Sequence, residues 1–267
     1  MNKKNITVII PLHIYNDKVS ELLNKAISSI PSDIENICII TTKEINENGI
    51  YFEKESNRIK IIANETENYD FCSMVNYGVK NVDTDWFSIL EYDDYYQNDW
   101  FNDANKYLYS EKDAMVYLPL VDLYDFNRFY NNIPRAYCGY ANEAPWAQSF
   151  SNDLGYIDNE SLQVYSNYNL TGAIFHTDTF KKIGMLKPKI KMTFWYEFLL
   201  RLTNKKYKVY VIPRVGYLHF IEREGSLSMN YTKEITEKAE IDYWLEAAKS
   251  ESYYSEERDI KPFEKKQ

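Results

Sequence analysis

Residues 85–96 read Asp-Trp-Phe-Ser-Ile-Leu-Glu-Tyr-Asp-Asp-Tyr-Tyr, and this stretch decides the fold. Residues 86–90 are apolar apart from Ser88, which is typical of a short strand buried on both faces. Three carboxylates, Glu91, Asp93 and Asp94, follow it directly. Like charges at a strand end repel unless a cation shares them, and open α/β sheets bind ligands at this edge. The stretch therefore predicts a Mg²⁺ or Mn²⁺ site that holds phosphates, with a solvated acidic turn as the alternative.

Apolar runs and helical patterns alternate on both sides of this stretch. They predict βαβ units and a mainly parallel sheet flanked by helices. Right-handed crossovers place the strand ends on one edge, so Pro11, Thr41, Asn64 and Asp93 are expected around one crevice. The expected strands are residues 6–12, 36–40, 58–63, 86–90 and 114–121, and the expected helices are residues 17–30, 68–80 and 100–109.

Composition bounds the class of protein. The chain has 267 residues, of which 45% are hydrophobic, so it can bury a core and is not a disordered chain. The net charge of −9 argues against a surface adapted as a whole to nucleic acid. Three widely spaced cysteines form no disulfide framework or zinc pattern. The apolar run at residues 6–12 is too short for a signal peptide or a membrane span, so we expect a cytoplasmic protein without a transmembrane segment.

Residues 122–168 lose this periodicity and are rich in Tyr, Phe and Trp. An irregular stretch of this length predicts a functional insertion. Sugar and base rings both stack on aromatic faces, so the insertion is a candidate acceptor platform. The alternative is that its aromatic side chains form a small core of their own.

Regular patterns return in the last third of the chain. We expect helices at residues 177–183 and 193–203, a strand at residues 207–212 that Pro213 breaks, and a polar loop at residues 217–228. An amphipathic helix is expected at residues 232–248, followed by a charged tail. Residues 181–214 hold ten basic residues and a single acid, Glu197, so this run would attract an anionic ligand.

The order of these motifs resembles the family 2 glycosyltransferases of the GT-A fold, over residues 6–228. Ile-Thr-Val-Ile-Ile-Pro-Leu at residues 6–12 resembles the first strand of that family. Asn64 and Asn76-Tyr-Gly-Val resemble its asparagine-bearing stretch, and Ile-Leu-Glu-Tyr-Asp-Asp at residues 89–94 is similar to its Leu-Asp-x-Asp-Asp signature. Gly172-Ala-Ile-Phe, Phe180 and Ile183-Gly184 resemble its acceptor-side stretch, and residues 197–202 are similar to its later helix. His219 with Gly225-Ser-Leu-Ser resembles the loop that closes the metal–diphosphate site.

This resemblance implies one GT-A domain at residues 1–230, with a nucleotide-binding half at about 1–121 and an acceptor half at about 122–230. Residues 231–267 would form a C-terminal helix and tail packed on that domain. The implied reaction is an inverting transfer of a sugar from a nucleotide-sugar donor, with a UDP-sugar favoured, to a hydroxyl acceptor. The implied metal ligands for Mn²⁺ or Mg²⁺ are Asp93, Asp94 and His219. The implied donor-binding residues are Pro11, Thr41, Asn64, Asn76, Glu91, Asp93 and Arg223.

Three departures from the family pattern carry information. Thr41 and Thr42 stand where the family carries an Asp for the nucleobase, and the first acid of the DxD motif is Glu91, one methylene longer. The Glu-Asp pair that contains the catalytic base falls at about Phe194 and Trp195. The nearest acid is Glu197, which we predict as the base; the alternative is an i,i+4 ion pair with Arg201.

Two rival functions are alternatives to a transferase, one suggested by these departures and one by related folds. The lost acids suggest a non-catalytic protein that binds carbohydrate or nucleic acid on the same fold. A nucleotidyltransferase would carry a Gly-rich phosphate loop after the first strand, and this chain has none there. For a transferase, a saccharide is the favoured acceptor, and a hydroxylated base in DNA is the alternative.

Overall fold

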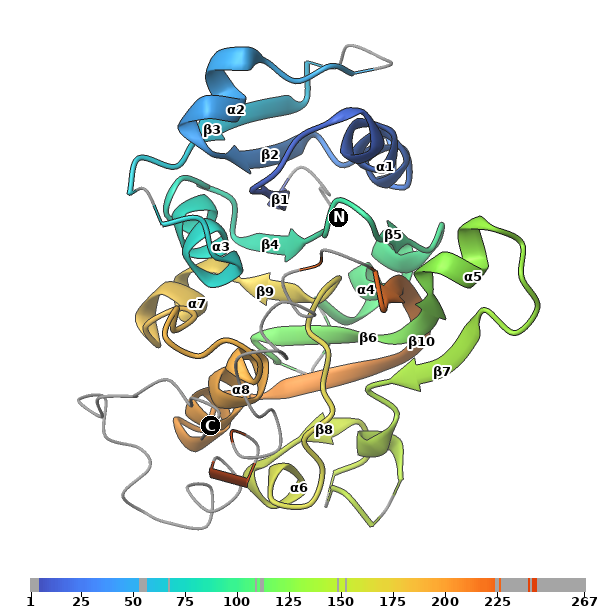
Figure 1. Cartoon of the computed structure of the whole chain (residues 1–267). Helices are drawn as coiled ribbons and strands as arrows, with labels where there is room; N and C mark the ends of the chain where they lie inside the picture. Colours follow the sequence, from blue (N-terminus) through green and yellow to red (C-terminus); the bar gives the residue numbers. More distant parts are fainter. Residues whose placement is uncertain are drawn as a thin grey trace, which may run out of the picture.

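The computed structural model describes residues 5–52, 57–66, 68–108, 110, 113–147, 149–151, 153–223, 226, 240, 242 and 243. These residues form a central sheet flanked by helices (Figure 1). The expected α/β class is therefore confirmed. The expected helix at residues 232–248, apart from three of its residues, and the charged tail lie outside the described residues, as does most of the stretch at residues 224–230.

Strands and helices alternate in the first half of the chain, as the periodicity predicts. Asn16, Thr42 and Asp70 each accept a hydrogen bond from a backbone N–H in the first turn of the helix that follows. These caps explain where the helices begin. The elements are β1 (Ile6–Leu12), α1 (Asp17–Ser28), β2 (Asn36–Thr41), α2 (Lys43–Asn48), β3 (Ile59–Ala63), α3 (Phe71–Lys80), β4 (Trp86–Ile89), β5 (Tyr95–Tyr96) and α4 (Trp100–Leu108).

The second half is more regular than its sequence suggests. The expected irregular insertion at residues 122–168 contains short helices and two strands that join the sheet. Pairing with neighbouring strands, rather than local periodicity, orders these residues. The elements are β6 (Val116–Asp125), α5 (Phe126–Tyr130), β7 (Tyr137–Ala141), η2 (Ala144–Trp146), β8 (Tyr156–Ile157), α6 (Asn159–Leu162), β9 (Ile174–His176), α7 (Thr177–Lys182), α8 (Phe194–Asn204) and β10 (Val209–Ile221).

One sheet joins strands from both halves of the chain, in the order β3-β2-β1-β4-β9-β6-β10-β5. Strands β1 to β4 are parallel, and β6 pairs in parallel with β10. Strand β9 runs antiparallel to both β4 and β6, so the two parallel groups point the same way. The carboxyl ends of β1, β2, β4, β6 and β10 therefore lie on one edge, where ligands are expected to bind.

Strand β10 corrects the prediction that Pro213 breaks a strand at residue 212. The strand continues to Ile221, and its pairing with β6 shifts register between Val211 and Val215. Proline has no N–H to donate, and an irregularity in the ladder accommodates it. As a consequence, His219 lies on a strand rather than in a loop, and its position is fixed by pairing with Leu123 of β6.

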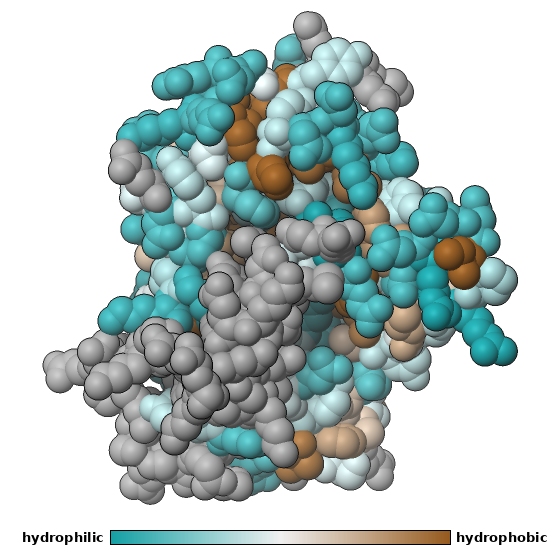
Figure 2. Space-filling view, viewed as in Figure 1, coloured by the Kyte–Doolittle hydropathy of each residue, from teal (hydrophilic) through white to brown (hydrophobic). Residues whose placement is uncertain are grey.

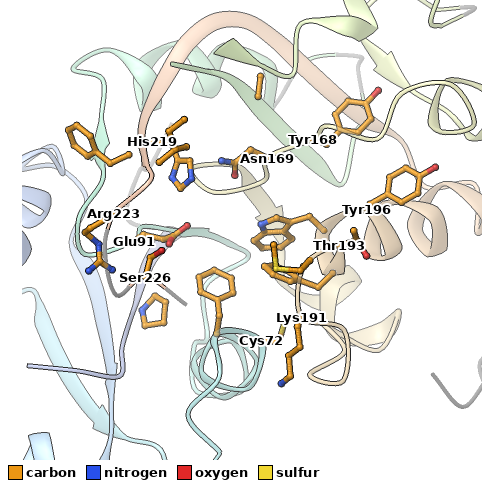
Figure 3. A pocket seen from close by; sticks show the side chains of 18 of the residues that line it. Cys72, Glu91, Tyr168, Asn169, Lys191, Thr193, Tyr196, His219, Arg223 and Ser226 are labelled. Atoms are coloured by element: carbon orange, nitrogen blue, oxygen red, sulfur yellow. The ribbon is translucent and has the colours of Figure 1, made fainter. Parts of the chain in front are cut away.

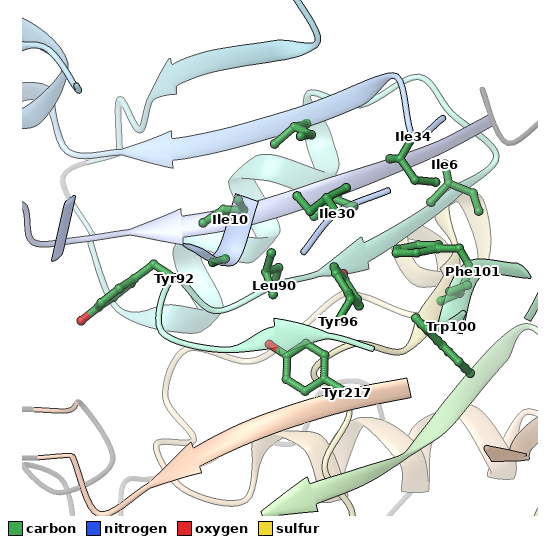
Figure 4. Close-up of a cluster of buried hydrophobic side chains, with 14 of the residues drawn as sticks. Ile6, Ile10, Ile30, Ile34, Leu90, Tyr92, Tyr96, Trp100, Phe101 and Tyr217 are labelled. Carbon is green, nitrogen blue, oxygen red and sulfur yellow. The ribbon is translucent and has the colours of Figure 1, made fainter. Parts of the chain in front are cut away.

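Two hydrophobic clusters pack against the sheet. The cluster drawn in Figure 4 joins isoleucines of β1 to Trp100 and Phe101 of α4 and to Tyr217 of β10. Helix α3 lies close to the sheet, since a Cβ on Gly78 would come within 2.7 Å of Ile9 Cγ2. Hydrophilic residues cover most of the described surface seen in Figure 2. Because the buried clusters are closely packed, the edge of the sheet that carries the acids is rigid.

Candidate metal and nucleotide-sugar site

The acidic turn after β4 is held by bonds from three directions. Leu90 N–H donates to Ile9 of β1 (3.0 Å), and Asp94 N–H closes the turn onto the carbonyl of Glu91 (3.1 Å). The hydroxyl of Tyr217, a fully buried residue of β10, accepts the N–H of Glu91 (3.0 Å). The carboxylates are therefore presented from a fixed backbone at the carboxyl edge of the sheet.

Asp94 and His219 form the centre of the site. Nδ1 of His219 lies 2.7 Å from Oδ2 of Asp94, and the N–H of Phe220 donates to the other carboxylate oxygen (2.9 Å). A carboxylate accepts, so Nδ1 carries the hydrogen and Nε2 is the ring nitrogen left for a metal. Asp94 thus ties β10 to the acidic turn, although the two residues are 125 positions apart.

Glu91, Asp94 and His219 could hold a cation together. One ligand atom of each lies within 4.8 Å of the others. Two carboxylate oxygens and one imidazole nitrogen are a donor set that suits Mn²⁺. The predicted ligands Asp94 and His219 belong to this group, whereas the third member is Glu91 and not the predicted Asp93.

The charges of this group perturb one another. Burial raises the pKa of Glu91 to about 8, and the charge of Asp94 adds to the effect. Burial alone would lower the pKa of His219, but the charge and hydrogen bond of Asp94 outweigh it and raise that pKa to about 10. Both shifts favour the protonated form, for Glu91 chiefly because burial disfavours its charge and for His219 because of the carboxylate of Asp94. A divalent cation would supply the same compensation.

Asp93 is paired within the protein. Nε of Arg223 bonds to Oδ2 of Asp93, and Nη2 of Arg223 donates to the hydroxyl of Tyr92 (2.7 Å). The guanidinium also lies 5.2 Å from the centre of the Tyr92 ring. Arg223 is therefore placed beside the acidic turn, as its predicted role at the diphosphate requires, and it neutralises Asp93 there.

A cavity of about 720 Å³ opens beside the acidic turn. Figure 3 shows Glu91, His219 and Arg223 on one side of it and Lys191, Thr193 and Tyr196 on the other. Helix α8 and the residues before it supply that second side, and Tyr168 of the aromatic-rich segment and its neighbour Asn169 also line the cavity. The cavity is large enough for a nucleotide sugar, since ligand pockets commonly measure about 300–1,000 Å³.

The predicted catalytic, metal-binding and donor-binding residues divide into two groups. Pro11, Glu91, Asp93, His219 and Arg223 line the cavity, and Asp94 is hydrogen-bonded to His219. The remaining predicted residues, Thr41, Asn64, Asn76 and Glu197, are not among the residues that line it.

Both asparagines have structural partners. The side chain of Asn64 donates to the carbonyl of Asn68 (2.8 Å) and accepts the N–H of Thr66 (3.0 Å). The side chain of Asn76 makes two hydrogen bonds to the backbone of Leu186 (2.7 and 3.0 Å). These bonds fix a turn and a long-range loop contact. They therefore account for an asparagine at each position without any role in ligand binding.

Thr41 has no such explanation. Its side chain is fully buried at the carboxyl end of β2, and its hydroxyl has no hydrogen-bond partner among the described residues. Its neighbour Thr42 instead caps α2 through Ile45 N–H (3.2 Å). A buried hydroxyl without a partner is costly, so Thr41 remains a candidate for contact with a ligand.

Glu197 is engaged in an ion pair. Its carboxylate receives both Nε (2.6 Å) and Nη2 (3.0 Å) of Arg201, and Lys187 Nζ lies 3.3 Å away. The side chain is 1% exposed and is compensated by two cations. This geometry favours the ion-pair alternative over the predicted role as catalytic base, because a base must reach the acceptor hydroxyl.

Sequence reasoning missed much of the cavity wall. Phe71, Phe194 and Trp195 line it, and the ring of Phe71 lies 5.4 Å from Phe194 and 5.9 Å from Trp195. Lys191 and Asp70 line it as well. The aromatic residues at positions 194 and 195 were a usable signal, because they replace the acids expected there.

The sheet order, the acidic strand end and the adjoining cavity together fit the GT-A fold expected from the sequence. The model of glycosyl transferase family 2 matches residues 7–182, and the chain belongs to that family. The family expected from the sequence is thereby confirmed. No curated protein matches the chain in a sequence search.

Solved structures show the same fold. The structure of S. aureus TarS residues 1–349 in complex with UDP-GlcNAc is 13% identical, with a TM-score of 0.62 over 91% of this chain and 66% of that chain. The mannosyltransferase PcManGT from Pyrobaculum calidifontis, in complex with GDP-Man and Mn²⁺, is 13% identical, with a TM-score of 0.53 over 83% of this chain and 58% of that one. The chain therefore spans less than two thirds of either.

Proposed function

We propose that the protein transfers a sugar from a nucleotide-sugar donor to a hydroxyl acceptor in a metal-dependent reaction with inversion. The observation that carries this proposal is the group of Glu91, Asp94 and His219 beside a cavity of about 720 Å³. Family membership supports glycosyl transfer. The solved complexes with UDP-GlcNAc and with GDP-Man and Mn²⁺ support a nucleotide sugar and a divalent cation. A UDP-sugar is our favoured donor, bound in the half of the domain at about residues 1–121.

The side chains of the site have distinct proposed roles. Glu91, Asp94 and His219 would hold the cation, which neutralises charge on the departing diphosphate when bound. Asp94 also orients His219 through its bond to Nδ1 (2.7 Å). Arg223 lies at the cavity wall and can turn from Asp93 towards a phosphate, because its guanidinium donates equally well to either anion.

The aromatic wall favours a saccharide acceptor. Tyr168, Phe194 and Trp195 line the cavity, and aromatic faces stack on sugar rings. The basic run at residues 181–214 gives less support to an anionic acceptor than its charge suggests. Arg201 is paired with Glu197, and Lys181 donates to the carbonyl of Val82 (3.3 Å). DNA remains the second candidate acceptor, and its binding would weaken steeply between about 50 and about 200 mM salt.

Donor binding tests the proposal directly. We expect UDP-GlcNAc or GDP-mannose to bind in calorimetric titration with Mn²⁺, and Asp94→Asn to weaken binding about 100-fold, since it removes one charge but keeps an acceptor for Phe220 N–H. Asp83→Asn is the matched control, because Asp83 is exposed beyond the other end of β4. Equal binding by the Asp94→Asn variant, or binding that is indifferent to Mn²⁺, would contradict the proposed site.

A binding protein without catalysis is the second candidate function. One observation favours it: Phe194 and Trp195 stand where the family pattern places an acid pair. Slow release of nucleoside diphosphate from the donor in the presence of Mn²⁺ would exclude it. We propose a cytoplasmic location on the ground of the sequence alone. In the described part of the chain, no helix is both long and apolar enough to cross a membrane.

A further inference from the structure

The first turn of α8 lacks a cap of its own. Thr193 occupies the N-cap position, and its side chain makes no capping bond to the helix. The backbone N–H groups at a helix start have no partner within the helix, and the helix dipole places positive charge there. An anion at this point therefore stabilises the helix start.

Glu240 supplies that anion from the far end of the chain. Its Oε2 accepts the N–H of Thr193 (2.7 Å), the hydroxyl of Thr193 (2.7 Å) and the N–H of Met192 (3.2 Å). The residue is 1% exposed, and it lies 47 positions beyond Thr193. A buried carboxylate is held in place by such charge-assisted bonds, so this contact is specific rather than incidental.

The capped segment is a wall of the candidate active site. Residues 191–196 all line the cavity, and the rings of Phe194 and Trp195 pack against Phe71 on α3. The acid pair expected at positions 194 and 195 is absent from this chain. Glu240 places a carboxylate at the start of the same helix, on Thr193, the residue directly before the aromatic side chains that replace that pair.

We propose that Glu240 is a positioning residue: by capping α8 it holds the wall at residues 191–196 in the orientation in which it receives the acceptor. The role in acceptor binding rests on the proposed transferase function. The positioning itself does not, because it concerns only the geometry of the cavity. Glu240 is not among the residues that line the cavity, so it acts through Thr193 and its neighbours.

Cys72 on α3 is a reporter for the position of this wall. It lines the same cavity and is 2% exposed. Burial raises its pKa well above the ordinary value, and the charge of Glu240 is among the further contributions in the same direction. Loosening of the wall and loss of the Glu240 charge would both make the thiol more reactive, because the thiolate is the nucleophile.

The experiment measures alkylation of Cys72 by iodoacetamide, resolved by peptide mass spectrometry. It is done in the full chain with Cys138→Ser, because Cys138 is the exposed cysteine. Glu240→Ala removes all three bonds, Glu240→Gln keeps an oxygen acceptor but removes the charge, and Asp242→Asn is the matched control at an exposed position. Cys38, buried in β2, reports global opening.

We expect Glu240→Ala to accelerate alkylation of Cys72 at least about tenfold, Glu240→Gln to have a smaller effect, and Asp242→Asn to have none. The Cys38 rate should stay constant in all variants. Unchanged Cys72 alkylation in Glu240→Ala would overturn the proposal. Equal acceleration of Cys38 and Cys72 would also overturn it, because it would show a general loss of stability.

A second measurement links the wall to the reaction. With UDP-GlcNAc as the donor probe and Mn²⁺, Glu240→Ala should leave the donor KM unchanged and lower kcat several-fold in the presence of a saccharide acceptor. A raised donor KM with unchanged kcat would contradict the positioning role at the acceptor wall. Failure of UDP-GlcNAc to bind to the wild type counts against the proposed function alone, since the alkylation result needs no donor.

Discussion

Two groups of buried charge lie on different parts of the molecule and have opposite balances. At the end of β4, three carboxylates, those of Glu91, Asp93 and Asp94, share one arginine and one histidine. In α8, a single carboxylate, Glu197, is paired with Arg201 and with Lys187. The first group lines or adjoins the cavity, and the second does not.

The difference shows what distinguishes a functional acid from a structural one. A buried charge is stable only when it is compensated. The protein itself compensates the charge of Glu197, so this carboxylate is not left for a ligand. Around Glu91 and Asp94 the protein leaves negative charge in excess. Protons compensate this excess in the unliganded chain, and a divalent cation would compensate it when bound.

The largest expected effect is on the compensated group. Glu197→Gln leaves the buried Arg201 and the partly exposed Lys187 without their carboxylate, and breaking a buried pair costs about 3–5 kcal/mol. We expect the free energy of unfolding in urea to fall by about 3 kcal/mol. Glu21→Gln on the exposed face of α1 is the control.

The same variant separates the two roles of Glu197. If it were the base, transfer would fall about 100-fold or more while stability stayed constant. Retained transfer in a destabilised protein would confirm the ion pair, and the two groups would then differ as described.

The second effect concerns the uncompensated group. His219→Ala removes one ligand atom and leaves Asp94 without its imidazole partner. We expect affinity for UDP in the presence of Mn²⁺ to fall about 10- to 100-fold, measured by calorimetry. His176→Asn is the control, since His176 caps α7 and asparagine is also a capping residue. An equal loss of UDP affinity in both variants would contradict the proposed role of His219 as a metal ligand.

The third effect is a pH dependence. Glu91 has a raised pKa of about 8 and His219 one of about 10, so the unliganded fold holds more protons than the unfolded chain. Its stability should fall as pH rises, from the ordinary pKa of each group through the raised one. Mn²⁺ replaces these protons, so the rise in Tm that it produces should grow between about pH 6 and about pH 8.5. Glu91→Gln should flatten this increase, and a stabilisation independent of pH would contradict the cation site.

The smallest effect is expected at Thr41. Thr41→Val removes a buried hydroxyl that has no partner among the described residues, so stability should rise by up to about 1 kcal/mol. Affinity for UDP should fall less than about tenfold if the hydroxyl meets the nucleotide. Measuring urea unfolding and UDP binding in the same variant checks both. Unchanged affinity would remove Thr41 from the donor site.

Local sequence determined the first half of the fold. Continuous apolar runs at β1, β2 and β4 and capped helices between them leave one arrangement, a parallel sheet with its carboxyl ends together. The acids at residues 91–94 could be recognised as a candidate site because they are adjacent in the chain. Motif order then indicated the GT-A family, which the family model confirms.

Tertiary structure decided the contacts between distant residues. Pairing with β6 carries β10 past Pro213 and so brings His219 to Asp94, 125 positions away. The same packing brings Arg223 into hydrogen-bonding contact with Asp93, and Glu240 into contact with the start of α8. No local pattern encodes such pairs. The sequence specifies the charge and type of each side chain, but the packing of the whole chain determines which partner it meets. For that reason the sequence determined where the acids lie, and only the folded protein decided which of them are left for a ligand.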